Sequence, residues 1–502
     1  MSRPPPSRIC ILGGGTAGWM AACLMQQAWG SRGSTITLIE SADIGIIGVG
    51  EGSTPQLKQF FDRLGIAEAD WMPRCNATYK VGIAFHGWSD KPGFEHYFHP
   101  FPSDLDRHTA PDLVRNAWLR RNGADVPAHP DRFFVPSLLA ERGLAPLPAP
   151  DFPFETSYGY HFDAVLVGRY LREVAVARGV IHVDALIASV ELAASGDVAA
   201  LVADDARRFE ADLFVDASGF RAVIAEAALG GRHVPFDSNL SNDRAVVTPT
   251  PLPADGPGVC TRATALGAGW AWHIPLTNRV GNGYVYSSRY IDPDAAAAEL
   301  RNHLGLPPDS DVRHLTMRVG RLEHSWQRNC LAIGLAQGFI EPLEATALHL
   351  VLATVEPFIA TMDRDGAVGR DLFNAAIARR YDGIRDYIVC HYRAAGRRDT
   401  DYWRDATGHD HLSDSLKAMF TAWFTGADLE EEIARQDIAG YYPSISWHCL
   451  LGGYGNFPTR LEPPTAAMRP ADMARIDRFV EACAGHFPTH AAALGRLAEA
   501  VA

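Results

Sequence analysis

The residues best suited to bind a ligand stand at the start of the chain, where a strand predicted over 8–12 leads into glycines and then a helix. The spacing Gly13-x-Gly15-x-x-Gly18 supplies a tight turn, close approach of the backbone to a ligand and close packing of helix on strand. The helix N-terminus offers N–H groups and a positive dipole end to a phosphate. The pattern predicts a site for the pyrophosphate of a dinucleotide.

An acidic residue supports this prediction. A second strand is predicted over 35–40 and ends at Glu40, where a carboxylate would bind a ribose hydroxyl. The alternative is a glycine turn that serves only to pack the helix on the strand. The glycine-rich segment from Gly45 to Pro55 is predicted to strap over the cofactor, and Pro55 suits the first turn of a helix reaching Leu64.

A lysine stands on a predicted strand from Thr78 to His86, in which polar or small residues alternate with apolar ones. Lys80 shares its face with small residues, so this face is suited to line a cavity. The alternative is an exposed lysine on a surface strand. The aromatic, proline-rich run from His96 to Pro102 predicts an ordered loop, whose rings would stack on a planar ligand or pack on the core.

A glutamate stands near a second predicted helix N-terminus. A strand over 331–335 runs into a helix predicted to begin near Pro342 and to continue to about Phe358. The N-terminus of this helix is suited to bind an anion through backbone amides. Glu344 is either a reactive carboxylate or a first-turn acid that complements the helix dipole.

The intervening sequence alternates helices and strands. A helix is predicted from Phe162 to Ala177, and strands from Val180 to Val202 with a turn at Ser195 and Gly196. The run from Asp212 to Gly219 is a second transition from strand to glycine, as in flavoproteins whose chain returns to the cofactor. Trp270 to Leu276 predicts a strand with two tryptophans on one face, and the sequence from about Gly366 favours helices.

Composition narrows the class of protein. The 502 residues carry a formal net charge of −13, which argues against a nucleic-acid partner. No apolar run reaches the roughly 18 residues needed to span a bilayer, and no signal peptide is recognised. Eight cysteines without a CxxC pair favour reduced thiols in the cytoplasm, and no metal site is predicted. We expect one intertwined body without repeats.

Four segments together resemble the flavin-dependent tryptophan halogenase family, from the first glycine turn to about Pro458. They are the turn continuing through Trp19-Met20, the strap around Gly48-Val49-Gly50-Glu51, the signature Trp270-x-Trp272-x-Ile274-Pro275, and Phe339-x-Glu341-Pro342-Leu343-Glu344. The resemblance implies an α/β, Rossmann-like FAD-binding fold of the flavoprotein monooxygenase type. It implies an FAD-binding and tunnel-forming body over 1–365, intertwined with substrate-binding segments around 78–102, and a mainly helical region over 366–502 that completes the substrate site.

The resemblance also implies a chemistry in which cofactor and substrate do not touch. FAD, reduced by a separate NAD(P)H-dependent flavin reductase, reacts with O2, and chloride or bromide is oxidised to hypohalous acid. This oxidant travels through a tunnel to an aromatic substrate. No NAD(P)H domain is recognised in the sequence, which agrees with an external reductase. The helix-rich C-terminal region is compatible with a homodimer.

Roles for individual residues follow from the same resemblance. Lys80 would form a haloamine or orient hypohalous acid, and Glu344 would assist halogen transfer and take the ring proton. The remaining implied site residues are Gly13, Gly15, Thr16, Ala17, Gly18, Glu40, Gly50, Ser53, Asp216 and Gly334 for the cofactor; Thr346 and Ala347 for the halide; His99, Phe101, Tyr441, Tyr442 and Trp447 for the substrate; and Trp270 and Trp272 as the family signature.

Two departures from the family pattern bear on substrate and halide. The pattern Phe-x-x-Pro-x-x-Ser-x-Gly ends here with Ala345 and Ala347; if the glycine relied on positive φ, Ala347 would reshape the halide pocket. Only four residues separate Tyr442 from Trp447, where tryptophan-specific relatives have a longer polar loop. We therefore predict an indole, substituted or within a larger molecule, at least as readily as free tryptophan.

Two other functions stay open at this point. A flavin-dependent aromatic monooxygenase would share fold and cofactor, although Lys80 and the tryptophan pair argue against it. A non-catalytic protein that binds flavin or an aromatic ligand would accommodate the altered Ala345 and Ala347. The natural substrate, the ring position, the halide preference and the oligomeric state are left open by the sequence.

Overall fold

The computed structural model describes residues 3–42, 44, 50–458 and 468–499. Its contacts divide the chain into two compact units, each assembled from three separate segments. The first unit comprises Met1–Asn76, Phe162–Asp237 and Arg318–Asp382, and the second comprises Ala77–His161, Ser238–Met317 and Gly383–Ala502. The division at residue 365 implied by the resemblance stays a prediction.

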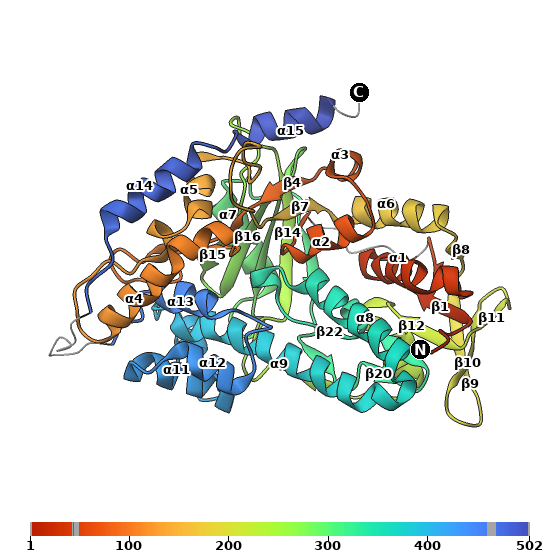
Figure 1. The fold of residues 1–502 in the computed structure, drawn as a ribbon. Coiled ribbons are helices and arrows are strands. Elements are labelled where there is room, and N and C mark those ends of the chain that lie inside the picture. The colour runs from red at the N-terminus through yellow and green to blue at the C-terminus, as the bar shows by residue number, and fades with distance from the viewer. Residues whose placement is uncertain (1–2, 43, 45–49, 459–467, 500–502) are drawn as a thin grey trace. The chain divides into compact units, whose positions relative to one another are not determined.

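The first unit is built around a sheet of six strands, counted over the described residues (Figure 1). Strand β1 lies at its centre, parallel to β2 on one side and to β12 on the other, so Ile11 pairs with both Leu38 and Val215. Strands β1 and β12 are almost wholly buried, as expected for parallel strands covered on both faces of the sheet. In order, the strands are β20 (Trp326–Gln327), β21 (Cys330–Ala332), β12 (Leu213–Asp216), β1 (Arg8–Leu12), β2 (Thr35–Glu40) and β8 (Ile181–Asp184).

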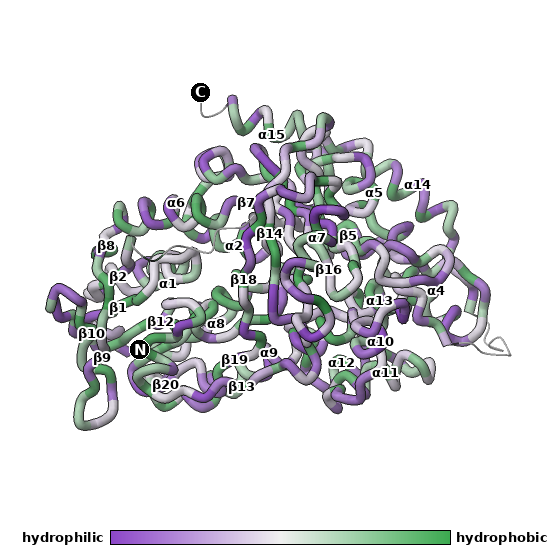
Figure 2. The backbone as a smooth tube through the Cα atoms, turned by 180° about the vertical axis from the view of Figure 1, so that it is seen from behind, coloured by the Kyte–Doolittle hydropathy of each residue, from purple (hydrophilic) through white to green (hydrophobic). Residues whose placement is uncertain are grey.

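Helices and shorter strands complete the first unit. Helix α1 packs against α6 and α8. The helix predicted from Phe162 forms as α6, which begins after Asp163 caps its N-terminus; its turns alternate green and purple in Figure 2, as expected for an amphipathic helix. The elements are α1 (Thr16–Trp29), β3 (Gly50–Gly52), α2 (Gln56–Arg63), α3 (Glu68–Trp71), α6 (Ala164–Ala177), β9 (Ile187–Leu192), β10 (Val198–Ala203), β11 (Arg208–Glu210), β13 (His233–Pro235), β19 (Gly320–Leu322), β22 (Gly338–Phe339) and α8 (Ala347–Arg364).

The second unit holds a mixed sheet of seven strands, again counted over the described part of the chain. Strand β16 carries the two tryptophans and pairs with β15 and β17 on either side. The order is β18 (Arg313–Thr316), β14 (Arg244–Thr250), β17 (Val280–Tyr286), β16 (Gly269–Pro275), β15 (Thr261–Leu266), β5 (Gly82–His86) and β6 (His96–Pro100).

The segment predicted as one strand from Thr78 to His86 forms two strands that pair with different partners. Strand β4 (Thr78–Lys80) pairs with β7 (Gly159–Asp163), whereas β5 belongs to the large sheet. The two strands are separated by Val81, whose N–H donates to the carbonyl of Val259. The alternation of polar and apolar residues therefore predicted that both segments are strands. It did not predict that β4 and β5 pair with different strands.

The prediction of a loop from His96 to Pro102 was wrong for most of that run. Residues 96–100 form β6, which pairs antiparallel with β5 from His86 opposite His96 to Gly82 opposite Pro100. Proline is tolerated because β6 is an edge strand and Pro100 is its last residue. Aromatic residues that favour a strand here outweigh the prolines that disfavour one.

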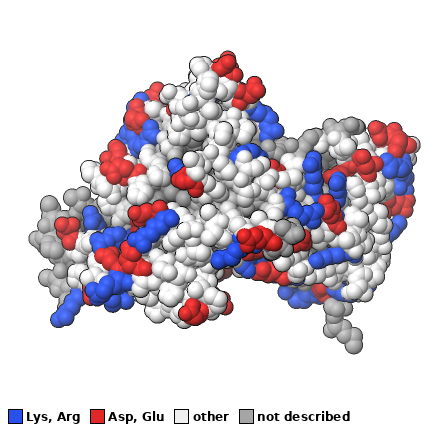
Figure 3. Space-filling model, turned by 90° about the horizontal axis from the view of Figure 1, so that it is seen from above, with Lys and Arg blue, Asp and Glu red and all other residues white. Residues whose placement is uncertain are grey.

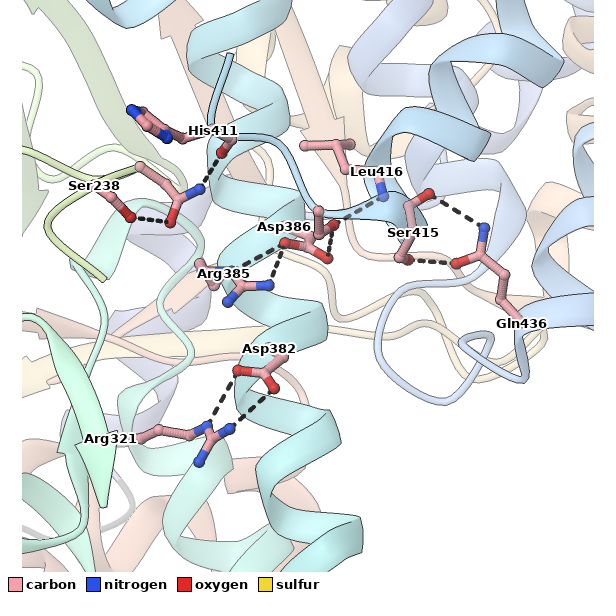
Figure 4. A network of polar contacts seen from close by, with 11 residues as sticks. Ser238, Arg321, Asp382, Arg385, Asp386, His411, Ser415, Leu416 and Gln436 are labelled. Carbon is pink, nitrogen blue, oxygen red and sulfur yellow. Dashed lines mark hydrogen bonds and ion pairs between the residues drawn. The ribbon is translucent and has the colours of Figure 1, made fainter. Parts of the chain in front are cut away.

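The described part of the chain after residue 366 is mainly helical. Helix α9 begins in the first unit and ends in the second. On α9, Asp386 accepts a hydrogen bond of 2.6 Å from Ser413, which itself caps α11 (Figure 4). The helices of the second unit are α4 (Ala110–Arg121), α5 (Val135–Arg142), α7 (Pro293–Leu304), the end of α9 (Arg370–Ala394), α10 (Asp401–Gly408), α11 (Asp414–Thr425), α12 (Leu429–Gln436), α13 (Ser444–Gly453), α14 (Met473–Ala484) and α15 (His490–Glu499).

The surface charges are mixed in sign. On the face drawn in Figure 3, acidic and basic side chains lie among one another, and neither sign forms a continuous patch there. Among the described helices, none combines the length and the apolar composition that crossing a membrane requires.

Candidate functional site

The glycine turn between β1 and α1 is shaped by its neighbours in the first unit. Gly13 has φ +117°, and a Cβ there would lie 2.2 Å from the carbonyl oxygen of Ala217. A Cβ on Gly18 would lie 1.9 Å from the carbonyl oxygen of Gly13. These two glycines are therefore required by the packing of strand, turn and helix, as the spacing predicted.

Gly15, unlike Gly13 and Gly18, does not face neighbouring backbone atoms. A Cβ on Gly15 would meet no atom within 4 Å among the described residues, so the space above this residue is open. Gly15 is also the N-cap of α1, and no described side chain caps that helix. The first-turn amides of Thr16 and Ala17 thus stand beside an open space, which fits the pyrophosphate of FAD.

This contrast gives a first prediction. Gly13→Ala is expected to destabilise the fold by about 2 kcal/mol or more, because the new methyl group overlaps the backbone and φ is positive. Gly15→Ala is expected to leave the thermal midpoint near the wild-type value and to weaken FAD binding about tenfold, equivalent to roughly 1.4 kcal/mol. Thermal unfolding without FAD and titration with FAD measure the two effects. Unchanged FAD affinity in Gly15→Ala would remove the open space from the cofactor site.

Two of the predicted cofactor residues, Glu40 and Asp216, have carboxylates that contact other residues of the protein. Glu40 lies beside Gly14, where a Cβ would be 1.6 Å from Glu40 Oε2, and its Oε1 is 2.9 Å from His182 Nε2. Asp216 is buried, and its two oxygens accept hydrogen bonds of 2.6 to 3.0 Å from Ser218, Ile224 and Ala225. Asp216 therefore orders the loop after β12, and any effect on a cofactor would pass through that loop.

The other predicted cofactor residues also lie in the first unit. Gly334 has φ +59°, and a Cβ there would lie 2.9 Å from the Cβ of Ala17 at the start of α1. Gly50 and Ser53 are buried on and just after β3. The part of the predicted strap over residues 45–49 lies outside the described residues.

The segment around Glu344 does not begin the long helix, which corrects the predicted start near Pro342. Pro342–Glu344 forms a separate 3-10 turn, and α8 begins only at Ala347. Glu344 is 4% exposed. The interpretation of Glu344 as a first-turn acid of the long helix is therefore excluded by its position. Thr346 and Ala347 stand at the N-terminus of α8, which no described side chain caps.

The positive φ in this corner belongs to Ala345 and not to Ala347. Ala345 has φ 55° and ψ 37°, whereas Ala347 is the first helical residue of α8. Ala347 therefore does not itself adopt the left-handed conformation, and a reshaped halide pocket stays a prediction. The left-handed residue is the alanine that stands where the family pattern has serine.

We predict that Ala345→Gly raises the free energy of unfolding by about 1 kcal/mol, because glycine adopts the left-handed region without the Cβ penalty. Ala360→Gly is the matched control, since Ala360 is exposed in the helical part of α8. The control is expected to lose about 1 kcal/mol. Chemical denaturation measures both variants, and a loss of stability in Ala345→Gly would contradict the prediction.

Lys80 is completely buried in the second unit. Its exposed fraction is 0%, which excludes the alternative of an exposed strand lysine. Its Nζ lies 5.3 Å from the centre of the Phe101 ring. Opposite Lys80 on β7 stands Gly159, which has no side chain. Burying a cationic side chain is costly, and the Phe101 ring beside Nζ offsets part of that cost.

Three of the predicted substrate residues meet at a tyrosine that sequence reasoning missed. The Tyr387 ring on α9 stacks on Tyr442 with centroids 3.6 Å apart, contacts Trp447 edge-on at 4.9 Å, and lies 6.1 Å from His99. Its hydroxyl donates to the carbonyl of Ser446 at 3.0 Å. In the sequence Tyr387 is one aromatic of a helical pattern, a signal more typical of core packing.

Tyr441 packs against the same helix. A Cβ on Gly383 would lie 2.3 Å from Cδ2 of Tyr441, so the absent side chain of Gly383 makes room for this ring. Because residues 383 and 387 share one face of a helix, α9 receives both predicted tyrosines on that face. The five predicted substrate residues all belong to the second unit.

The two signature tryptophans lie on β16, as predicted. Both are buried, and their ring centroids are 6.2 Å apart. Trp272 lies over Gly283 of the neighbouring β17, where a Cβ would be 2.2 Å from the indole. The glycine therefore provides the space in which the indole packs.

A cavity of about 780 Å³ lies within the second unit, between α4, α12 and α13. Its lining includes Pro102, which follows Phe101, and Ser444, Ile445 and His448 of α13. Burial lowers the pKa of His448 to about 4. Within the described part of the chain, no three His, Cys, Asp or Glu side chains gather as they would around a metal ion.

Comparison with known proteins assigns the chain to one family. The tryptophan halogenase family model matches residues 8–470. KtzR, a 7-chloro-L-tryptophan 6-halogenase of Kutzneria sp. (strain 744), is 38% identical over 505 residues that cover 94% of each chain. Two flavin-dependent halogenase structures also match with a TM-score of 0.85. Xcc4156 from Xanthomonas campestris is 36% identical over 98% of each chain, and BrvH from Brevundimonas sp. BAL3 is 34% identical over 99% of this chain and 100% of its own. The chain belongs to the flavin-dependent tryptophan halogenase family.

Proposed function

We propose that this halogenase uses reduced FAD, O2 and chloride or bromide to halogenate an indole or a tryptophan derivative, with Lys80 and Glu344 as catalytic residues. The observation that carries the proposal is Lys80 itself, buried at 0% exposure with its Nζ 5.3 Å from the Phe101 ring. Bound reduced FAD would supply, with O2 and halide, the oxidising equivalent held by hypohalous acid. The residues of the chain then direct this oxidant and accept the proton that the ring loses.

Lys80 is suited to hold hypohalous acid because its amine or ammonium group can hydrogen-bond the oxidant or form a haloamine with it. Its buried position keeps the oxidant from water and unrelated nucleophiles. Glu344, also buried, would stabilise the positive charge that develops on the ring and then take the ring proton. The uncapped N-terminus of α8 at Thr346 and Ala347 would hold the halide through backbone amides.

The substrate is proposed as an indole that carries a substituent or belongs to a larger molecule. Tyr442 is followed after one residue by the start of α13, so the segment is short where a tryptophan-specific site has a longer polar loop. The lining of the 780 Å³ cavity includes Pro102, the chain neighbour of Phe101, and we propose that this cavity gives room to a substituent. The names of the relatives include tryptophan and different ring positions, which supports an indole ring without fixing the carbon attacked.

A separate NAD(P)H-dependent flavin reductase is proposed as the source of reduced FAD. The test combines protein, FAD, such a reductase, NADH, O2 and bromide with indole and with indoles bearing neutral, cationic or anionic substituents. Mass spectrometry is expected to find a monobrominated product by its isotope pattern. Hydroxylated products without halogenated ones would support a monooxygenase, and absence of any product with all the indoles and both halides would overturn the proposal.

A further inference from the structure

A buried histidine is hydrogen-bonded between β4, the strand that carries Lys80, and β15, the neighbour of the tryptophan strand β16. His161 lies on β7 directly opposite Thr78 of β4, while Lys80 lies opposite Gly159. In an antiparallel pair, residues opposite each other and residues two positions along share one face. His161, Thr78 and Lys80 therefore lie on the same face, and both His161 and Lys80 are 0% exposed.

The hydrogen bonds of His161 and Thr78 connect four strands, β4, β7, β15 and β16. Thr78 Oγ1 lies 3.1 Å from His161 Nδ1 and donates to the carbonyl of Pro275, the last residue of β16, at 2.7 Å. His161 Nε2 lies 3.0 Å from Oγ1 of Thr261 on β15. Strand β4 is thus connected through Thr78 to the strand of the signature tryptophans, and through His161 to the neighbouring strand.

The direction of these bonds fixes the tautomer of the imidazole. A carbonyl oxygen can only accept, so the single hydroxyl proton of Thr78 is used by Pro275. Thr78 Oγ1 must then accept from His161, which places a proton on Nδ1. In a neutral ring Nε2 is an acceptor, and it receives the hydroxyl proton of Thr261.

The ring is held in its neutral form by its surroundings. Burial lowers the pKa of His161 well below its usual value, and the nearby Lys80, His490 and His273 lower it further. His490 and His273 have their own pKa values lowered to about 4, chiefly by burial. With these lowered pKa values the three histidines are uncharged at neutral pH.

We infer that His161, as the neutral Nδ1–H tautomer, is a positioning residue that acts through Thr78 to hold β4 and thereby aim Lys80. The inference rests on the proposed function, since it concerns the residue assigned there to halogen transfer. His161 itself touches neither substrate nor cofactor in this role. Its effect is on the placement of Lys80, where a displacement of about an ångström is enough to cost large factors in rate.

The first test measures the ring directly. The protein is labelled with 15N-histidine, and long-range 1H–15N correlation identifies which ring nitrogen carries the proton, with His161→Asn assigning the signal. The expected pattern is a protonated Nδ1 and an unprotonated Nε2. A protonated Nε2, in either a neutral or a charged ring, would overturn the inference without involving catalysis.

The second test uses the partners of the ring. Thr78→Val removes the bridging hydroxyl while keeping the shape of the side chain, and Thr78→Ser restores it. Thr248→Val is the matched control. Thr248 lies on β14, is also buried, and donates a hydrogen bond of 2.8 Å to the backbone carbonyl of Asp311. Halogenated product formed per flavin oxidised is expected to fall about tenfold in Thr78→Val, to recover in Thr78→Ser and to be unchanged in Thr248→Val.

Two conservative replacements of His161 distinguish the role of its Nδ1 from the role of its Nε2. An asparagine amide reaches the place of Nδ1 and can donate to Thr78, whereas a glutamine amide reaches the place of Nε2. We call the halogenated product formed per flavin oxidised the coupling. In His161→Asn the coupling is expected to stay within about threefold of the wild-type value, and in His161→Gln it is expected to fall about tenfold. Equal coupling in Thr78→Val and Thr248→Val, or better coupling in His161→Gln than in His161→Asn, would overturn the inference. Halogenation by a Lys80→Met variant at the wild-type rate would instead overturn the proposed function and leave the tautomer intact.

Discussion

Replacing Lys80 with methionine is expected to lower the rate of aromatic halogenation by about 100-fold or more while oxidation of reduced flavin continues. Removing a single preorganised group that acts on the transition state typically costs about 10²–10³ in rate. Methionine resembles lysine in length and avoids a cavity at a site with 0% exposure. Because burying an ammonium group is unfavourable, the thermal midpoint is expected to stay the same or rise.

The measurement follows product by mass spectrometry and flavin oxidation by absorbance in the same reaction. Lys417→Met is the matched control, because its side chain is 55% exposed beside Asp414 and belongs to no proposed site. The control is expected to halogenate at the wild-type rate. Halogenation by Lys80→Met within a few-fold of the control would show that Lys80 has no part in the transfer.

Replacing Glu344 with glutamine is expected to lower halogenation by about 100-fold, since a general base in position contributes about 10²–10⁴ to a rate. The amide keeps the volume of the carboxylate in a side chain that is 4% exposed. It cannot take the ring proton, and it stabilises a cationic ring less well than a carboxylate does. Flavin oxidation and the thermal midpoint are expected to change little.

A deuterium isotope effect separates the two roles of the carboxylate. When a base takes the ring proton rapidly, a ring-deuterated substrate reacts at nearly the rate of the ordinary substrate. In Glu344→Gln the loss of the proton is expected to become slow, so a primary isotope effect should emerge. Glu323→Gln, which alters an exposed carboxylate paired with Arg232 in the same unit, is the control. Unchanged rate and isotope effect in Glu344→Gln would exclude Glu344 as the base.

The local features of the cofactor turn could be predicted because each is encoded by adjacent residues. The strand, the glycine turn and α1 formed as the spacing indicated, and α6 formed within the predicted range. Three local predictions were wrong, and in two of them distant partners decided the outcome. Residues 96–100 became β6 because β5 offered a free edge, the run from Thr78 divided because β7 captured β4, and α8 began five residues after Pro342.

By itself the sequence determined the family and the strand–glycine–helix turn at its start, since these depend on residue types at fixed spacings. Only the tertiary structure decided that Lys80 is buried against Phe101, that Tyr387 contacts three of the predicted substrate residues, and that His161 is hydrogen-bonded to Thr78 on the lysine strand. These relations connect residues far apart in the chain. Burial, ring contact and proton placement are properties of such neighbours, and no local pattern specifies them.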